Sequence, residues 1–141
     1  PGIIVFVADS LKGQAGVLLG LSLVGTPLAA VVGGLLAIIG HSFSIFLRFH
    51  GGKGVATSLG VLTMLMGNVT IVVFVLWFTI VYITRYVSLG SVVAGFLTPV
   101  LAAFFSYPME YIVFTVIAAF LVIVRHRENI KRLMNGTENK V

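Results

Sequence analysis

Hydrophobic runs separated by short polar or glycine-rich breaks divide this chain from end to end. Six runs can be drawn: Gly2–Gly25, Leu28–Leu47, Val55–Met66, Val69–Thr84, Leu89–Phe105 and Tyr111–Val124. A helix that crosses a membrane needs about 20 apolar residues, with a range of roughly 17 to 25. Several runs are shorter than that, and the third is the weakest. The pattern therefore predicts about six hydrophobic helices, some of which cross only part of a membrane or lie behind their neighbours.

The composition indicates that these hydrophobic helices belong to a membrane protein. The chain has 141 residues, of which 59% are hydrophobic and 9% are charged, and its mean hydropathy is +1.15. A soluble domain carries about a quarter charged residues, so this chain could not cover its surface in water. Small residues such as Gly33, Gly34, Gly90 and Ala94 would let helices approach closely. We predict an all-α, polytopic membrane helix bundle in which residues 1–141 form a single integral membrane domain.

The few charged residues indicate an orientation. The formal net charge is +5, and much of it lies in the C-terminal tail, at Arg125, Arg127, Lys131, Arg132 and Lys140. The positive-inside rule places this tail in the cytoplasm. Counting crossings backward puts Arg85, Arg48, Lys53 and Pro1 on the same side. A basic membrane protein is expected to meet lipid headgroups or an anionic substrate, and we predict no nucleic-acid partner. The absence of cysteine excludes disulfides and thiolate metal sites.

The loop after the second run contains the sequence Gly51-Gly52-Lys53-Gly54. Glycines let backbone N–H groups converge on an anion, and a helix that starts at Val55 would point its positive end at the same place. Lys53 would add a cation for phosphate oxygens. The spacing is not that of a Walker A loop. A flexible turn with an interfacial lysine is the alternative, and spacing alone gives the two interpretations equal weight.

A second polar cluster, "RHRENIKRL", follows the last hydrophobic run. On a helix His126 and Asn129 lie three residues apart and share a face with which they could bind a polyol or position a hydroxyl. The alternative is a basic membrane anchor with internal ion pairs that include Glu128, and periodicity alone favours that alternative. Asn135-Gly136 is typical of a helix C-cap.

Further polar residues lie near the ends of the runs. Asp9 and Lys12 are three apart inside the first run, where a structural ion pair is favoured over direct catalysis. His41 is expected to bind a backbone or loop partner rather than a metal. Ser88 is a candidate N-cap, and Ser91, inside the first helical turn, could reach a ligand. Three scattered histidines and four acidic residues form no recognisable ligand set, so we predict no metal site.

Four stretches taken together carry a family resemblance: "DSLKG", "GHSFSIFLRFHGGKGVAT", "RYVSLGS" and "RHRENIKRLMNGTEN". Their order and spacing resemble the bacterial acyl-phosphate:glycerol-3-phosphate acyltransferase family, PlsY, over essentially all 141 residues. The resemblance implies a seven-span enzyme of the bacterial inner membrane that acts in phospholipid biosynthesis. It would transfer a fatty acyl group from a long-chain acyl phosphate to the 1-hydroxyl of glycerol-3-phosphate. The products would be lysophosphatidic acid and phosphate, with no covalent intermediate, cofactor or metal, and with the active site on the cytoplasmic side.

The resemblance also implies roles for individual residues. The family's phosphate-binding motif matches Gly51, Gly52, Lys53 and Gly54, and Ser91 matches a serine that lines the active site near the phosphate. His126 and Asn129 match the motif that faces the glycerol moiety, where they would be catalytic. Supporting or structural roles fall to Asp9, Lys12, His41 and Glu128.

This sequence departs from the family pattern at several points. Ser44 stands where proline is usual and His50 where lysine is common. The family's first span and its Ser-Gly-Asn-x-Gly-Ala-Thr-Asn motif, with a following arginine, would precede Pro1. We therefore expect residues 1–141 to be N-terminally incomplete.

Two functions of other classes compete with this one. The first is a small membrane transporter or channel for an anionic solute, in which Asp9 and Lys12 would form a coupling site. The polar residues gather at one end of the predicted bundle instead of running through its middle, which counts against it. The second is a non-catalytic membrane subunit whose basic tail binds anionic lipid. It leaves the glycine-lysine loop and the pairing of His126 with Asn129 without a purpose.

Overall fold

The computed structural model describes residues 2–44 and 53–141, and within these ranges its regular structure is entirely helical. The helices are α1 (Gly2–Val24), α2 (Pro27–Ser42), α3 (Val55–Leu65), α4 (Gly67–Thr84), α5 (Val87–Phe104), α6 (Met109–Arg125) and α7 (Arg127–Met134). The first six correspond to the six predicted hydrophobic runs, although α2 ends at Ser42 and residues 45–47 of the second run lie outside the described residues. The all-helical fold class is confirmed. The seventh is the polar segment that follows them.

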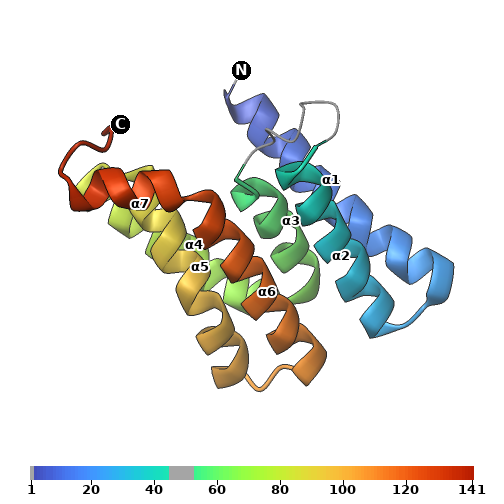
Figure 1. The fold of residues 1–141 in the computed structure, drawn as a ribbon. Helices are drawn as coiled ribbons and strands as arrows, with labels where there is room; N and C mark the ends of the chain where they lie inside the picture. Colours follow the sequence, from blue (N-terminus) through green and yellow to red (C-terminus); the bar gives the residue numbers. More distant parts are fainter. Residues whose placement is uncertain (1, 45–52) are drawn as a thin grey trace.

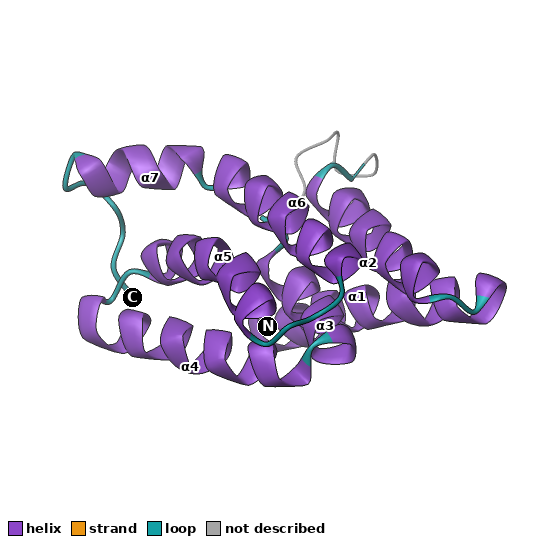
Figure 2. Ribbon diagram, turned by 90° about the horizontal axis from the view of Figure 1, so that it is seen from below, coloured by secondary structure: helices purple, strands orange, loops and turns teal. Residues whose placement is uncertain are grey.

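The helices form two groups that pack side by side (Figure 1). Helices α1, α2 and α3 pack on one another, and α5 packs between α4 and α6. The groups meet where α2 packs on α6 and where α3 packs on α4. Helix α7 bends away from α6 by 60°, and Figure 2 shows it as a separate rod at one end of the bundle. The junction of the two groups is therefore also where the N-terminus of α3 approaches the bend between α6 and α7.

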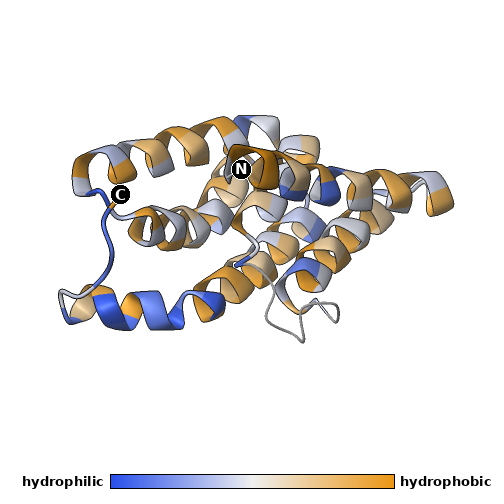
Figure 3. Ribbon diagram, turned by 90° about the horizontal axis from the view of Figure 1, so that it is seen from above, coloured by the Kyte–Doolittle hydropathy of each residue, from blue (hydrophilic) through white to orange (hydrophobic). Residues whose placement is uncertain are grey.

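Three helices, α1, α4 and α5, are long and apolar enough to cross a membrane, and α6 with α7 forms a bent pair that could make a fourth crossing. Helices α2 and α3 are apolar but shorter. Many large apolar side chains point outward, including Ile3 (81% exposed), Tyr82 (76%) and Phe104 (77%). Hydrophilic residues gather on α7 and the C-terminal tail (Figure 3). An apolar exterior of this kind belongs in lipid, with the polar residues concentrated at one end.

Hydrogen bonds between segments distant in the sequence show which helix ends lie together. Lys53 Nζ donates to Asn129 Oδ1 at 2.5 Å, and the Val141 N–H donates to the Arg85 carbonyl at 2.9 Å. The start of α3, the end of α4 and the whole of α7 therefore share one end of the bundle, which we call the polar end. This confirms that Lys53, Arg85 and the basic tail lie on one side. Arg48 and Pro1, assigned to the same side, lie outside the described residues.

Helix α1 approaches its neighbours so closely that only glycine fits at the contacts. A Cβ on Gly60 would lie 2.0 Å from the Ser10 carbonyl oxygen, and one on Gly33 would lie 2.1 Å from the Gly16 carbonyl oxygen. Contacts this short involve backbone, which cannot move aside as a flexible side chain can. Small residues therefore set the spacing of α1, α2 and α3, as the sequence predicted for Gly33.

We expect Gly60→Ala to destabilise the bundle by about 1–3 kcal/mol, because the added methyl forces α1 and α3 apart. Gly40→Ala is the matched control. Gly40 also lies inside a helix, but none of the described residues comes within 4 Å of its Cβ position, so alanine there should be neutral or stabilising by up to about 1 kcal/mol. Thermal unfolding of the two variants in the same detergent measures the difference. Equal melting temperatures would contradict the close approach at Gly60.

Candidate active site

The site begins where the glycine-lysine loop enters α3. Gly54 is the N-cap residue of α3 and has a left-handed conformation, with φ of 79°. A Cβ at this position would lie 3.0 Å from Ser42 Oγ, so both conformation and space favour glycine. Gly54 has no side chain with which to cap α3, so the first N–H groups of the helix face the polar end with the positive end of the helix dipole. Gly51 and Gly52, predicted to join this phosphate grip, lie outside the described residues.

Asn129 connects Lys53 to the C-terminal tail. Its amide oxygen accepts from Lys53 Nζ at 2.5 Å, and its amide nitrogen donates to Glu138 Oε2 at 2.8 Å. The side chain is buried, with 8% of the residue exposed. An amide can accept on one side and donate on the other, which neither a carboxylate nor an ammonium can do. Asn129 therefore holds a cation and a carboxylate on opposite sides without carrying a charge itself.

Glu138 is the anchor of this network. Besides Asn129, its carboxylate accepts from Ser88 Oγ at 2.9 Å, from Arg132 Nε at 3.2 Å and from the Asn139 N–H at 3.0 Å. Its side chain is only 4% exposed. Burial by itself raises the pKa of Glu138, but the hydrogen bonds from Asn129, Asn139, Ser88 and Arg132 outweigh it and lower the pKa to about 2. The carboxylate is therefore ionised at neutral pH and fixes α7 against α5.

A glycine turn brings Glu138 back to this position. Gly136 has φ of 71°, and the N–H groups of Gly136 and Thr137 donate to the carbonyls of Leu133 and Arg132 at 3.3 and 2.8 Å. This is the helix cap predicted at Asn135-Gly136, which is confirmed, and it reverses the chain after α7. Sequence analysis selected Glu128 and missed Glu138. Glu128 lies exposed on α7 and makes no side-chain hydrogen bond or ion pair with the described residues.

His126 occupies the break between α6 and α7. It is 3% exposed, and its Nδ1 lies 2.7 Å from the Val122 carbonyl oxygen. A carbonyl oxygen only accepts hydrogen bonds, so Nδ1 carries the hydrogen and the neutral ring keeps Nε2 as an acceptor. His126 and Asn129 come from one short segment, as their predicted shared face requires.

The electrostatics of the polar end favour anions. Desolvation lowers the pKa of Lys53; Glu138 opposes this effect, and the positive charges of Arg132 and Arg125 add to it. Lys53 stays exposed to solvent at its other side. Lys53 thus lies near two further cations, Arg132 and Arg125, whereas the Glu138 carboxylate beside it is already hydrogen-bonded to four donors. The excess positive charge suits a ligand with phosphate oxygens.

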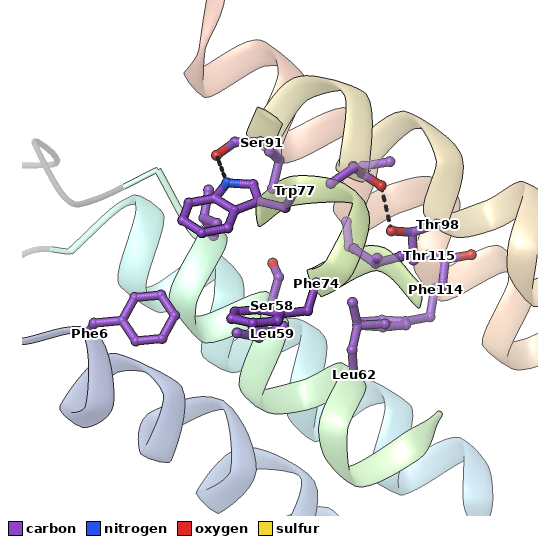
Figure 4. Close-up of a pocket in the computed structure, with 17 residues that line it drawn as sticks. Phe6, Ser58, Leu59, Leu62, Phe74, Trp77, Ser91, Thr98, Phe114 and Thr115 are labelled. Atoms are coloured by element: carbon purple, nitrogen blue, oxygen red, sulfur yellow. Dashed lines mark hydrogen bonds between the residues drawn. The ribbon is translucent and has the colours of Figure 1, made fainter. Parts of the chain in front are cut away.

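An apolar pocket lies between the helices, and Figure 4 shows the side chains that line it. Seventeen residues from five helices line it: Phe6, Val55, Ser58, Leu59, Leu62, Val73, Phe74, Trp77, Ser91, Ala94, Gly95, Thr98, Phe114, Thr115, Ala118, Ala119 and Val122. On three helices a residue of the polar end lies within about one turn of a residue that lines the pocket. These pairs are Lys53 and Val55, Ser88 and Ser91, and His126 and Val122. The mouth of the pocket therefore adjoins the polar network.

Two hydroxyls lie near the pocket mouth in different states. Ser91 Oγ donates to the Val87 carbonyl at 3.0 Å and accepts from Trp77 Nε1 at 3.2 Å. Ser58 Oγ is buried and has no hydrogen-bond partner in the part of the chain that the structure describes. An unpaired hydroxyl in an apolar site is costly, so Ser58 is the side chain best placed to gain from a polar ligand atom. Sequence analysis did not select it.

One predicted position needs correction. Ser88 is not the N-cap of α5, because the helix begins at Val87 with Tyr86 as its cap, and the Ser88 hydroxyl binds Glu138 instead. His41 Nδ1 lies 3.6 Å from Asp9 Oδ1, and the loop that was predicted to offer it a partner includes residues 45–52, which lie outside the described residues. The predicted ion pair between Asp9 and Lys12 is confirmed at 2.9 Å. Asp9, Lys12 and His41 line a groove between α1 and α2, separate from the apolar pocket.

No group of three histidine, aspartate or glutamate side chains that could hold a metal ion is present within residues 2–44 and 53–141. The chemistry available there is that of the polar network and the pocket.

Comparisons with known proteins agree on one family. The family model described as glycerol-3-phosphate acyltransferase matches residues 1–136. A glycerol-3-phosphate acyltransferase of Carboxydothermus hydrogenoformans is 47% identical over 141 residues, which are 100% of this chain and 71% of that relative. Glycerol-3-phosphate acyltransferase 2 of Moorella thermoacetica is 48% identical over 141 residues, again 100% of this chain and 72% of that relative.

Two solved structures are similar over nearly the whole chain. Both are crystal structures of PlsY (YgiH), an integral membrane glycerol 3-phosphate acyltransferase, one in its glycerol 3-phosphate form and one in its lysophosphatidic acid form. The first has a TM-score of 0.93 and 35% identity and covers 99% of this chain and 70% of that one. The second has a TM-score of 0.92 and 36% identity and covers 99% and 71%.

Proposed function

This chain belongs to the glycerol-3-phosphate acyltransferase family, and we propose that it transfers a fatty acyl group from an acyl phosphate to the 1-hydroxyl of glycerol-3-phosphate. The products are lysophosphatidic acid, a precursor of phospholipids, and inorganic phosphate. One observation carries the proposal: a cationic hydrogen-bonded end lies at the mouth of an apolar pocket inside a membrane bundle. This arrangement suits a reaction between one small phosphate ester and one substrate with both a phosphate and an acyl chain.

The step needs no nucleophile from the protein. An acyl phosphate is already activated, so the glycerol hydroxyl attacks its carbonyl carbon and the bond from that carbon to the phosphate oxygen breaks. The hydroxyl proton passes to Nε2 of His126 or to an oxygen of the departing phosphate, both of which are acceptors at this step. The protein contributes mostly positioning and charge.

The described side chains divide this task among them. Lys53 and the first N–H groups of α3 hold phosphate oxygens and reduce the repulsion between the two anionic substrates. Asn129 orients Lys53 and, with His126, binds the glycerol moiety. Ser58, whose hydroxyl lacks a partner among the described residues, donates to the acyl carbonyl, and Ser91 lies beside it. Gly51, Gly52 and Gly54 complete the phosphate grip, and no metal or cofactor takes part.

The acyl chain enters the pocket from the membrane side of the same site. The protein is a multi-pass protein of the bacterial inner membrane, and the polar end with its C-terminal tail faces the cytoplasm, where glycerol-3-phosphate is available. Placing the site at this boundary lets a water-soluble acceptor meet a lipid-soluble donor.

An assay in detergent tests this function. The protein at its full natural length is purified and given glycerol-3-phosphate with palmitoyl phosphate or palmitoyl-CoA, in the presence of a metal chelator. We expect lysophosphatidic acid and phosphate to form in equal amounts, with palmitoyl phosphate as the preferred donor. Preference for palmitoyl-CoA would contradict the acyl-phosphate donor. Flux of glycerol-3-phosphate into liposomes without acylation would instead support the alternative function of a transporter. In that function Asp9 and Lys12 would form the coupling site.

A further inference from the structure

The hydroxyl of Ser91 is held from two helices, unlike the other hydroxyls of the apolar pocket. Three other hydroxyl side chains line the pocket: Ser58, Thr98 and Thr115. Two of them donate only to a carbonyl of their own helix, and the first has no partner among the described residues. Ser91 Oγ also donates within its helix, to the Val87 carbonyl at 3.0 Å, but in addition it accepts from Trp77 Nε1 on α4 at 3.2 Å (Figure 4).

The indole of Trp77 reaches Ser91 because α4 and α5 approach closely at Gly90. A Cβ on Gly90 would lie 3.0 Å from Trp77 Cδ1, the ring atom bonded to Nε1, and 3.2 Å from the Trp77 carbonyl oxygen. A side chain at this position would therefore push the ring or its helix away. The Phe74 ring also stacks on the indole, with 6.0 Å between the ring centroids. These contacts fix the direction in which the indole N–H points.

The hydrogen of the Ser91 hydroxyl is the part of this arrangement that can turn to a ligand. A serine hydroxyl has one hydrogen and two acceptor positions, and Trp77 fills one acceptor position with a group that only donates. The Val87 carbonyl lies in the first turn of α5, where it also accepts from the backbone N–H four residues later. The Ser91 O–H can therefore leave Val87 for another acceptor while Trp77 keeps the oxygen in place. Accepting a hydrogen bond also polarises the hydroxyl and makes it a better donor.

The surroundings of Ser91 indicate an anionic acceptor. Ser88 lies one turn earlier on α5 and donates to Glu138 at 2.9 Å. Glu138 also accepts from Asn129, which binds Lys53. Ser91 itself is buried, with 4% exposed, and lines the pocket. It is therefore a neutral donor placed one turn from a cationic network, which suits the oxygen of a phosphate.

We propose that Trp77 is a positioning residue: its indole N–H holds the Ser91 oxygen so that the Ser91 hydroxyl donates to a phosphate oxygen of a substrate. The proposal rests on the acyltransferase function and adds to it a residue that touches no reacting atom. Both substrates carry a phosphate group, and the kinetic test below distinguishes them.

Removing the indole N–H while keeping the shape of the ring tests this role. Trp77 of the full-length protein is replaced by benzothienylalanine, in which a sulfur atom takes the place of the N–H, through codon suppression. We expect the KM for one phosphate substrate to rise about 3- to 10-fold, the value of one hydrogen bond, with kcat changed less than twofold. A rise for glycerol-3-phosphate would assign Ser91 to the acceptor, and a rise for palmitoyl phosphate would assign it to the donor. Equal changes in both KM values, or in neither, would overturn the proposal.

A double-mutant cycle separates this role from simple packing. Trp77→Phe and Ser91→Ala are measured alone and together, and Trp77→Phe should raise the same KM less than twofold once residue 91 is alanine. Independent effects of the two substitutions would show that the indole acts by packing, against the proposal. The matched control is Phe78→Leu, which shortens an aromatic side chain on the same helix that is 57% exposed and does not line the pocket. It should leave both KM values unchanged.

Failure of this inference is distinguishable from failure of the proposed function. If the unaltered protein formed no lysophosphatidic acid from palmitoyl phosphate, the proposed function would fail, and this inference with it. Normal acyl transfer with unchanged KM values in the benzothienylalanine variant would overturn the role of Trp77 alone.

Discussion

Replacing Asn129 by aspartate is expected to lower kcat/KM for glycerol-3-phosphate by at least about 100-fold, the effect of roughly 3 kcal/mol or more when the buried Glu138 carboxylate loses a donor and meets a like charge. The substitution replaces the amide NH₂ by an oxygen and changes the side-chain volume little. It removes a donor, because the Asn129 amide nitrogen donates to Glu138 at 2.8 Å. An aspartate would place a second carboxylate against Glu138, which is ionised because its pKa is about 2. Repulsion between the two would separate α7 from the tail and move Lys53 from its position.

A variant in which the Asn129 amide and the Glu138 carboxylate exchange places tests the hydrogen-bond network more directly. In the double variant Asn129→Asp, Glu138→Gln, the amide and the carboxylate change places, so the pair keeps its hydrogen bond and its total charge. We expect this variant to recover at least about tenfold of the lost kcat/KM, since interacting neighbours show coupling of about 0.5–3 kcal/mol. Melting temperature and kcat/KM are measured for both single variants and the double. Additive losses in the double variant would contradict the network.

The helical pattern was predictable from the sequence because its cause is local. Lipid requires apolar side chains around each helix, so breaks such as Gly67-Asn68 and Pro108 mark helix ends directly. The polar end followed from the basic C-terminal tail and from counting crossings backward to Arg85 and Lys53. The cap at Gly136 was also predictable, because a left-handed turn after a helix favours glycine.

The network around Glu138 was not predictable in the same way. Its partners Ser88 and Asn129 lie 50 and 9 residues away along the chain, and no helical periodicity joins a tail residue to the first turn of α5. The sequence favoured Glu128 because it lies inside the recognisable "RHRENIKRL" cluster. The pocket escaped detection for a related reason: residues such as Phe6 and Phe114 look like ordinary lipid-facing or core positions until the helices are packed together.

Lys53 should control the alkaline limit of the reaction. Its pKa is lowered, chiefly by desolvation and further by Arg132 and Arg125. A lowered pKa means that the ammonium is lost at a lower pH than the ordinary lysine value of about 10.4. The phosphate groups of the substrates keep their negative charge throughout this range. Affinity for glycerol-3-phosphate should therefore fall as the pH rises toward the ordinary lysine pKa.

Two substitutions separate the charge from the side chain. Lys53→Met should lower kcat/KM about 10- to 100-fold at neutral pH, the value of one or two charged hydrogen bonds to phosphate, and should abolish the alkaline decline. Lys53→Arg should keep part of the activity and show no alkaline decline, because a guanidinium stays protonated. Initial rates at varied glycerol-3-phosphate, corrected for spontaneous hydrolysis of the donor, give these profiles. The same decline in the arginine variant would assign the titration to another group and remove Lys53 from the phosphate grip, since its charge is the property on which that role depends.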